Sequence, residues 1–213
     1  MQNLPLETIA WVSLGFFAFA LIHSLLARSA LKEKVLSVYP KAAAFYRFIY
    51  VCIAVFTLWL WWYFVPDMGT VVYSIRFPFN LLFYGVQTIA VLGFIQSLRS
   101  SGTQSFLGIK QMRLYLKKKK LPGYLDEPSD ENLYRSGLYK YVRHPLYTFS
   151  ILLMLARPDM TLRWAILTVL FTLYFWIGSY FEERELIKRF GEKYITYQNE
   201  VPRFIPTLKQ FFR

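Results

Sequence analysis

The sequence predicts an all-α integral membrane protein that crosses the bilayer about five times. Of its 213 residues, 55% are hydrophobic and only 18% are charged, against about 25% charged in an ordinary soluble domain. Apolar runs of about 20 residues recur along the chain, and each is long enough to cross the ~30 Å of hydrocarbon in a bilayer. The composition therefore excludes a soluble globular enzyme, and a mean hydropathy of +0.31 excludes intrinsic disorder.

The apolar runs give the expected membrane spans, which are 5–27, 45–66, 79–98 and 162–181. A further apolar segment, 145–156, has only 12 residues. A helix of that length covers about 18 Å, so we expect a partial or tilted span. Arg157, Pro158 and Asp159 should break the helix that precedes them. The stretch 145–181 is therefore predicted to form a hairpin of one short helix and one full-length helix.

The basic residues predict how the chain is oriented. The chain has 25 Lys and Arg residues and a formal net charge of +12, and 22 of the 25 lie in 28–47, 99–145 and 182–213. Because basic residues are retained in the cytoplasm, we expect the N-terminus outside and the C-terminus in the cytoplasm. A bacterial inner membrane is the location that we expect, although the charges do not specify it. Topology and anionic headgroups account for this charge, so no nucleic-acid partner is expected. The first span lacks preceding basic residues, which favours a retained span over a cleaved signal sequence.

We expect one membrane domain over 1–213, with a three-helix part (1–98), a cytoplasmic and interfacial loop (99–136) and a C-terminal hairpin and tail (137–213). In the loop, Ile109, Met112 and Leu116 share one helical face, which predicts a helix lying on the membrane surface. Segment 121–136 is rich in proline, glycine and acidic residues and is typical of a surface turn. A single cysteine, in the second span, rules out a disulfide framework and a cysteine-based metal site, and no metal is expected.

The entrance to the short helix carries an unusual group of residues, Gly-Leu-Tyr-Lys-Tyr-Val-Arg-His-Pro-Leu-Tyr at 137–147. Proline is favoured at the first position of a helix, so we expect Pro145 to begin the helix, beside Arg143 and His144. Helix N-termini bind anions, and an arginine adds a bidentate partner for a carboxylate or phosphate. The sequence therefore predicts a small-anion site. The alternative is an interfacial anchor in which Arg143 reaches the headgroups.

A second group follows the last span, where Glu182, Glu183 and Glu185 stand at the C-terminal end of an apolar helix. Acidic residues there oppose the helix dipole and the positive-inside preference, so neither explains their presence. Because the hairpin returns the chain to the side it left, we expect Glu182 and Glu183 near Arg143 and His144. A ligand with a carboxylate and a positive centre would satisfy both groups. The alternative is a salt-bridge network among these side chains.

These stretches resemble the isoprenylcysteine carboxyl methyltransferase and phospholipid methyltransferase superfamily. The resemblance rests on an ordered set of segments: GLYKYVRHPLY at 137–147, EERELI at 182–187, FGEKYITY at 190–197 and VPRFIP at 201–206. It implies an integral membrane enzyme that binds S-adenosylmethionine on the cytoplasmic side and takes its methyl acceptor from within the membrane. The sequence departs from the pattern at Phe149, where the family often has a small residue.

Carried over by position, the resemblance implies which residues bind the methyl donor. Glu182 and Glu183 would bind its amino or ribose groups. The residues lining the cofactor pocket would be Gly137, Leu138, Tyr139, Val142, Arg143, His144, Pro145 and Tyr147. S-adenosylmethionine carries a carboxylate, an ammonium and a sulfonium, which match the paired anionic and cationic groups expected from the residues alone.

The first half resembles the methanethiol S-methyltransferase group in three short segments: His23-Ser24-x-x-Ala27-Arg28, Tyr46-Arg47-x-x-Tyr50 and Gly108-Ile109-Lys110-Gln111. His23 and Arg28 would lie in or beside the hydrocarbon, where an ionisable group is by default either functional or paired. If the acceptor is a thiol, His23 or His144 would take its proton and Arg28 would favour the thiolate. Alternatively, His23 only hydrogen-bonds a neighbouring helix. The resemblance also implies that Tyr46, Arg47 and Tyr50 line the substrate site.

One polar face is expected in the third span, where Asn80, Tyr84 and Gln87 recur at helical spacing. These residues either line the substrate cavity or hold helices together. The predicted function is methylation of a small or lipophilic thiol, or of an isoprenylcysteine-like carboxylate. Two alternatives stay open: an NADPH-dependent membrane sterol or steroid reductase, which shares the Arg-His-Pro-x-Tyr segment, and a non-catalytic membrane sensor or assembly protein on the same fold.

Overall fold

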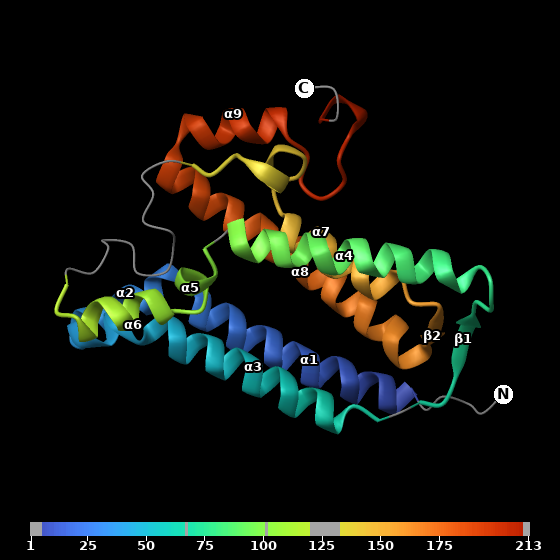
Figure 1. The fold of residues 1–213 in the computed structure, drawn as a ribbon. Coiled ribbons are helices and arrows are strands. Elements are labelled where there is room, and N and C mark those ends of the chain that lie inside the picture. Colours follow the sequence, from blue (N-terminus) through green and yellow to red (C-terminus); the bar gives the residue numbers. More distant parts are fainter. Residues whose placement is uncertain (1–5, 67, 101, 120–132, 211–213) are drawn as a thin grey trace. The chain divides into compact units, whose positions relative to one another are not determined.

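The computed structural model describes residues 6–66, 68–100, 102–119 and 133–210. Its Cα positions form two compact units. Unit 1 comprises Met1–Asp67 and Ser101–Ser129, and unit 2 comprises Met68–Ser100 and Asp130–Arg213. The single domain over 1–213 stays a prediction. Figure 1 shows the elements coloured along the chain.

Unit 1 is built on two long antiparallel helices that pack side by side (Figure 1). Its elements are α1 (Leu6–Ala27), α2 (Ser29–Val38), η1 (Pro40–Ala44), α3 (Tyr46–Phe64), α5 (Thr103–Phe106) and α6 (Ile109–Leu116). The Trp61 indole of α3 donates a hydrogen bond to the Val12 carbonyl of α1 at 3.1 Å. An added Cβ at Gly15 would lie 2.7 Å from the Trp61 ring. The absence of a side chain at Gly15 therefore lets the two helices approach closely.

Unit 2 contains the helical hairpin predicted for 145–181. Its elements are β1 (Val71–Ser74), α4 (Asn80–Ser100), η2 (Gly137–Lys140), α7 (Pro145–Leu155), β2 (Asp159–Thr161), α8 (Leu162–Phe190), α9 (Glu192–Glu200) and η3 (Leu208–Gln210). Helix α7 packs against both α4 and α8 (Figure 1). The Phe149 ring of α7 occupies the space beside Gly93 of α4, where an added Cβ would lie 2.4 Å from the ring.

The predicted class, an all-α polytopic membrane protein, is confirmed. Within the described part of the chain, four helices are long and apolar enough to cross a membrane, namely α1, α3, α4 and α8. Helix α7 has 11 residues and is a shorter apolar helix, as predicted for the partial span. Large apolar side chains on the long helices are exposed, for example Trp11, Phe17 and Leu82. Exposed apolar surface of this kind suits contact with lipid.

Helix α8 is longer than the predicted span, which ended at residue 181. The apolar part ends there, but the helix continues to Phe190 because Glu, Arg, Leu and Lys are good helix formers. Gly191, with φ of +56°, follows the last helical residue and ends the helix. The acidic residues Glu182 and Glu183 therefore lie on a continuous helix rather than in a loop.

The predicted break between α7 and α8 is confirmed. Helix α7 ends at Leu155, and Arg157 places its guanidinium carbon 4.2 Å from the Trp164 ring centre. Strand β2 then pairs antiparallel with β1, with Ser74 opposite Asp159. This two-stranded sheet was not predicted, because strands of three and four residues are too short to show a sequence period.

Two expectations concern the loop 99–136. The predicted helix is confirmed as α6, while its place on the membrane surface stays a prediction. Of the predicted surface turn 121–136, residues 121–132 lie outside the described residues.

Candidate active site

The Glu183 carboxylate is the centre of a buried group of polar side chains in unit 2. Its side chain is 3% exposed. Oε1 accepts hydrogen bonds from Arg143 Nε at 2.8 Å and from His144 Nε2 at 3.0 Å. Oε2 accepts from Arg203 Nη2 at 2.7 Å and from Gln198 Nε2 at 2.9 Å. We call these five residues the Glu183 cluster.

The Arg143 guanidinium is held by protein acceptors on several sides. Its side chain is 9% exposed. Besides the bond to Glu183, Nη1 donates to the carbonyls of Gln198 at 3.0 Å and Val201 at 2.5 Å. This is the salt-bridge network that the sequence left open as an alternative. An anion bound by Arg143 would have to displace these acceptors.

The tail segment 202–204 runs along the start of α7. The backbone N–H groups of Arg143 and His144 donate to the carbonyls of Pro202 at 2.9 Å and Arg203 at 3.1 Å. The Thr148 hydroxyl donates to the Phe204 carbonyl at 2.9 Å. Pro145 begins α7, as predicted. The motif Val-Pro-Arg near the C-terminus is thus part of the same site as Arg-His-Pro.

Glu182 differs from its neighbour in exposure and in partners. Its side chain is 47% exposed, and Oε2 accepts a hydrogen bond from the Tyr147 hydroxyl at 2.9 Å. The same oxygen lies 3.5 Å from Nδ1 of His144. The Tyr147 ring stacks on the His144 ring, with centroids 5.4 Å apart, and on the Phe175 ring at 4.8 Å. A partly exposed carboxylate therefore lies beside three stacked rings.

The ionisation of His144 follows from its neighbours. Burial alone would lower the pKa of this imidazole, but its hydrogen bonds with Glu182 and Glu183, and the charges of both, raise the pKa above its usual range. The two carboxylates thus favour the protonated form of the imidazole. Burial raises the pKa of the Tyr194 and Tyr197 hydroxyls, which keeps both neutral.

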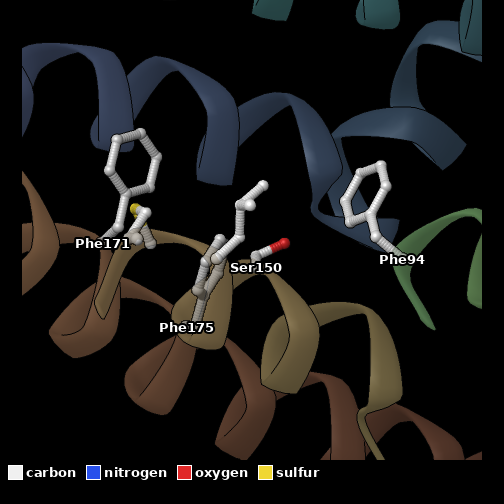
Figure 2. A pocket seen from close by; sticks show the side chains of 6 residues that line it. Phe94, Ser150, Phe171 and Phe175 are labelled. Atoms are coloured by element: carbon white, nitrogen blue, oxygen red, sulfur yellow. The ribbon is translucent and has the colours of Figure 1, made fainter. Parts of the chain in front are cut away.

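An apolar cavity of about 240 Å³ adjoins this group. Figure 2 shows the side chains around it, which come from α4, α7 and α8: Phe94, Ser150, Leu153, Met154, Phe171 and Phe175. Phe175 also stacks on Tyr147. The cavity and the polar group therefore share one aromatic wall.

The remaining residues predicted to bind the cofactor lie at the start of the same segment. Gly137 has φ of +61° and begins η2, which also contains Leu138. The Tyr139 carbonyl accepts a hydrogen bond from the Tyr197 hydroxyl at 2.7 Å. Val142 is 3% exposed. Unit 2 thus brings Arg143, His144, Tyr147, Glu182 and Glu183 into one contact network, with Tyr139 tied to α9.

In unit 1, three of the predicted residues lie together. The Tyr50 hydroxyl of α3 is 2.6 Å from Nε2 of His23 in α1. This contact agrees with the alternative for His23, a hydrogen bond to a neighbouring helix. Arg47 places its guanidinium carbon 5.3 Å from the Tyr50 ring centre and donates from Nε to the Phe106 carbonyl at 2.8 Å. The Tyr46 hydroxyl donates to the Leu26 carbonyl at 2.8 Å.

The other predicted residues are more dispersed. Arg28 is exposed and precedes the first turn of α2. Asn80 begins α4, and Tyr84 and Gln87 follow on the same helix. Tyr84 is 48% exposed, and the cavity in Figure 2 is lined by other residues. The roles of these four residues stay predictions.

Two members of the Glu183 cluster were not predicted as site residues. Arg203 belongs to the segment VPRFIP at 201–206, which carries part of the family resemblance. Its place in that segment was the signal that could have identified it. Gln198 gives no such signal, because its contact arises only when α9 folds back toward α8.

The fold and this group of side chains define a polytopic membrane protein with a polar, aromatic-walled site at one end of a helical hairpin. The sequence model of the family described as phospholipid methyltransferase matches residues 75–193. The chain belongs to this family. It is therefore a membrane methyltransferase, and we retain neither the reductase nor the non-catalytic alternative.

Named relatives agree with the family. A methanethiol S-methyltransferase of Pseudomonas deceptionensis is 30% identical over 203 residues, covering 90% of this chain and 70% of that protein. One of Mycobacterium tuberculosis is 26% identical over 189 residues, covering 88% and 74%. A protein-S-isoprenylcysteine O-methyltransferase of Schizosaccharomyces pombe is 34% identical over 158 residues, covering 67% and 60%. No solved structure gives a significant match to this chain.

Proposed function

We propose that this membrane methyltransferase transfers a methyl group from S-adenosylmethionine to a small or lipophilic thiol. The proposal depends on how much of the chain is similar to relatives named methanethiol S-methyltransferase. The match to the enzyme of Pseudomonas deceptionensis covers 90% of the chain. That similarity includes the first half, which the family match over 75–193 reaches only in part. A bacterial inner membrane, with the C-terminus in the cytoplasm, is the proposed setting.

The residues of unit 2 suit the proposed methyl donor. S-adenosylmethionine supplies a methyl group activated on a sulfonium. The exposed Glu182 carboxylate suits its ammonium or ribose hydroxyls, because charged acceptors form the stronger hydrogen bonds. The stacked rings of Tyr147 and Phe175 suit a sulfonium or an adenine. We assign the donor to this region, with the residues from Gly137 to Tyr147 lining it.

The proposed methyl transfer needs a nucleophilic sulfur and a base that takes the thiol proton. A thiol S–H loses its proton to a base, the sulfur forms a bond to the methyl carbon, and the carbon–sulfonium bond breaks to leave a thioether and S-adenosylhomocysteine. The sequence offered His23 and His144 as the base. We propose His23, because the carboxylates of Glu182 and Glu183 favour the protonated form of His144, and we propose Arg28 as the group that favours the thiolate. In the described structure His23 already shares a hydrogen bond with Tyr50, which fixes its ring orientation.

A prenylated cysteine is the second candidate acceptor. The Schizosaccharomyces pombe relative is named for that substrate and is 34% identical over the part it matches. The apolar cavity of Figure 2, next to Tyr147 and Phe175, favours an acceptor with an apolar chain. A carboxylate acceptor is already ionised at neutral pH and needs no base.

The test uses the full chain purified in detergent. Calorimetry with S-adenosylhomocysteine should give micromolar binding, and NADPH titrated in the same way should give none. Transfer of isotope-labelled methyl groups is then compared between methanethiol and N-acetyl-S-farnesylcysteine. Label in dimethyl sulfide supports the thiol acceptor, and label in a base-labile ester supports the prenylcysteine. Failure to bind S-adenosylhomocysteine would overturn the proposed donor.

A further inference from the structure

We propose that the adjacent residues Glu182 and Glu183 have different roles. Glu183 is a positioning residue that fixes the tail segment 202–204 against the start of α7. Glu182 is the carboxylate that contacts the bound methyl donor. The part concerning Glu182 rests on the proposed function, whereas the part concerning Glu183 does not.

The hydrogen-bonding capacity of Glu183 is already used. Its two oxygens accept from five donor atoms of four side chains, the fifth being Arg203 Nε at 3.3 Å. A carboxylate offers about four lone-pair sites. With its side chain 3% exposed, Glu183 has neither the surface nor the free acceptor sites that a ligand would need.

The partners of Glu183 explain what it positions. Arg203 belongs to the tail, Gln198 to α9, and Arg143 and His144 to the approach to α7. The Glu183 carboxylate therefore joins these three segments of the described chain at one point. Removing its charge would take away the carboxylate that the Arg143 and Arg203 guanidinium groups share, and one of the two carboxylate partners of His144, at high cost in a buried site.

Glu182 lies one residue further back on the same helix, about 100° around its axis. It therefore lies on a different side of the helix from Glu183, where it contacts Tyr147. Its carboxylate contacts the Tyr147 hydroxyl at 2.9 Å and His144 Nδ1 at 3.5 Å, with 47% of the side chain exposed. This leaves acceptor sites open on the side where the rings of Tyr147 and Phe175 stack.

The experiment compares three single substitutions of nearly equal shape: Glu182→Gln, Glu183→Gln and, as the matched control, Glu185→Gln. Glu185 lies on the same helix and pairs with Lys188 at the surface. Each full-length variant is measured in detergent for affinity toward S-adenosylhomocysteine, for the rate of tryptic cleavage in the tail, and for the pKa of His144 by NMR. A His23→Asn background assigns the signal, because the chain has 2 histidines.

Glu182→Gln should lower the affinity for S-adenosylhomocysteine about 10- to 100-fold and leave tail cleavage at the wild-type rate. Glu183→Gln should raise tail cleavage by about tenfold or more, because cleavage follows the population of the open form, and should lower the pKa of His144. If Glu183→Gln does not fold, Arg203→Lys replaces it. That variant keeps the charge, loses the two-nitrogen contact, and should raise tail cleavage by a smaller factor.

Equal tail cleavage in Glu183→Gln or Arg203→Lys and in the Glu185→Gln control would overturn the role of Glu183. Unchanged S-adenosylhomocysteine affinity in Glu182→Gln would overturn the role of Glu182. If the wild type binds no S-adenosylhomocysteine, the proposed function fails together with the role of Glu182. The cleavage and NMR measurements still decide the role of Glu183, so the two failures are distinguishable.

Discussion

At the scale of single residues, His144 connects the site to the stability of the protein. Its folded pKa is raised above the usual 6.5, with burial opposed by the two neighbouring glutamates. Protonated His144 therefore stabilises the folded state. That contribution is fully present below the unfolded pKa and is lost as the pH rises through the folded pKa.

We therefore predict that the free energy of unfolding falls as the pH rises above about 6.5. Denaturation in detergent between about pH 6 and 9 measures this dependence. His144→Asn removes the titrating group, so that variant should lose the part of the slope that His144 causes. An identical slope in the wild type and the variant would contradict the prediction.

Arg143 gives a second prediction at this scale. Its guanidinium donates from Nε to a carboxylate and from Nη1 to two carbonyls, a geometry that one ammonium does not reproduce. Arg143→Lys should lower the free energy of unfolding by about 2 to 4 kcal/mol. Arg184→Lys, at an exposed position of α8, is the control and should change it by less than about 0.5 kcal/mol. Chemical denaturation of both variants measures the difference.

The sequence indicated which residues meet, but not which of them are buried. A helical hairpin must return the chain to the side it left, so the approach of Glu182 and Glu183 to Arg143 and His144 was predictable. The contrast between 47% and 3% exposure depends on where the tail folds. Neither spacing nor composition specifies that fold, because the tail contacts are long-range backbone hydrogen bonds.

At the scale of elements, the contact between α4 and α7 depends on a matched pair of residues. An added Cβ at Gly93 would lie 2.4 Å from the Phe149 ring, and ordinary contact begins near 3.5 Å. Gly93→Ala should therefore destabilise the protein by about 1 to 3 kcal/mol through overpacking. The departure of Phe149 from the small residue often found in the family is thus accommodated by a glycine on the facing helix.

A double-mutant cycle tests this pairing by thermal denaturation. Phe149→Ala removes the ring, so Gly93→Ala in that background should cost little, and the interaction energy should be about 0.5 to 3 kcal/mol. Gly85→Ala is the control on the same helix, because nothing lies within 4 Å of its added Cβ. Strictly additive effects of the two substitutions would contradict the proposed contact.

The elements that the sequence predicted well are those with a strong physical signature. Each long helix has an apolar run that a bilayer requires, and α7 has a proline at its start. The extension of α8 to Phe190 carries no apolar run and was therefore missed. The pairing of β1 with β2 depends on segments far apart in the chain, whose closeness follows from the hairpin rather than from local pattern.

At the scale of the whole molecule, the two halves differ in what they share with other proteins. The family match over 75–193 contains α7 and α8 but neither α1 nor α3, whereas relatives named methanethiol S-methyltransferase cover 88% or more of the chain. We therefore expect donor binding to depend on unit 2, and the acceptor to depend on residues of unit 1 such as His23.

His23→Ala should accordingly retain S-adenosylhomocysteine affinity and lower thiol methylation by about 10²- to 10⁴-fold, the usual contribution of a general base. Calorimetry and labelled-methyl transfer on the same preparation measure the two quantities. Tyr50→Phe removes the hydroxyl that bonds His23 but keeps the ring, and it should give a smaller loss. Equal methylation by wild type and His23→Ala would exclude His23 as the base.

The orientation of the chain is the last property at this scale. Basic residues concentrate in 28–47, 99–145 and 182–213, and positive charge resists translocation, so these segments should lie in the cytoplasm. A Cys52→Ser variant removes the chain's single cysteine. Single cysteines are then introduced at the exposed positions Lys34 and Val72.

A membrane-impermeant maleimide added to intact bacterial cells should label Val72→Cys and leave Lys34→Cys unlabelled, and both should react after lysis. The reverse pattern would place the donor region outside the cell, away from cytoplasmic S-adenosylmethionine, and would contradict the proposed setting of the enzyme. The charge distribution thus bears on function, because it determines whether Arg143 and Glu182 face the compartment in which a methyl donor is available.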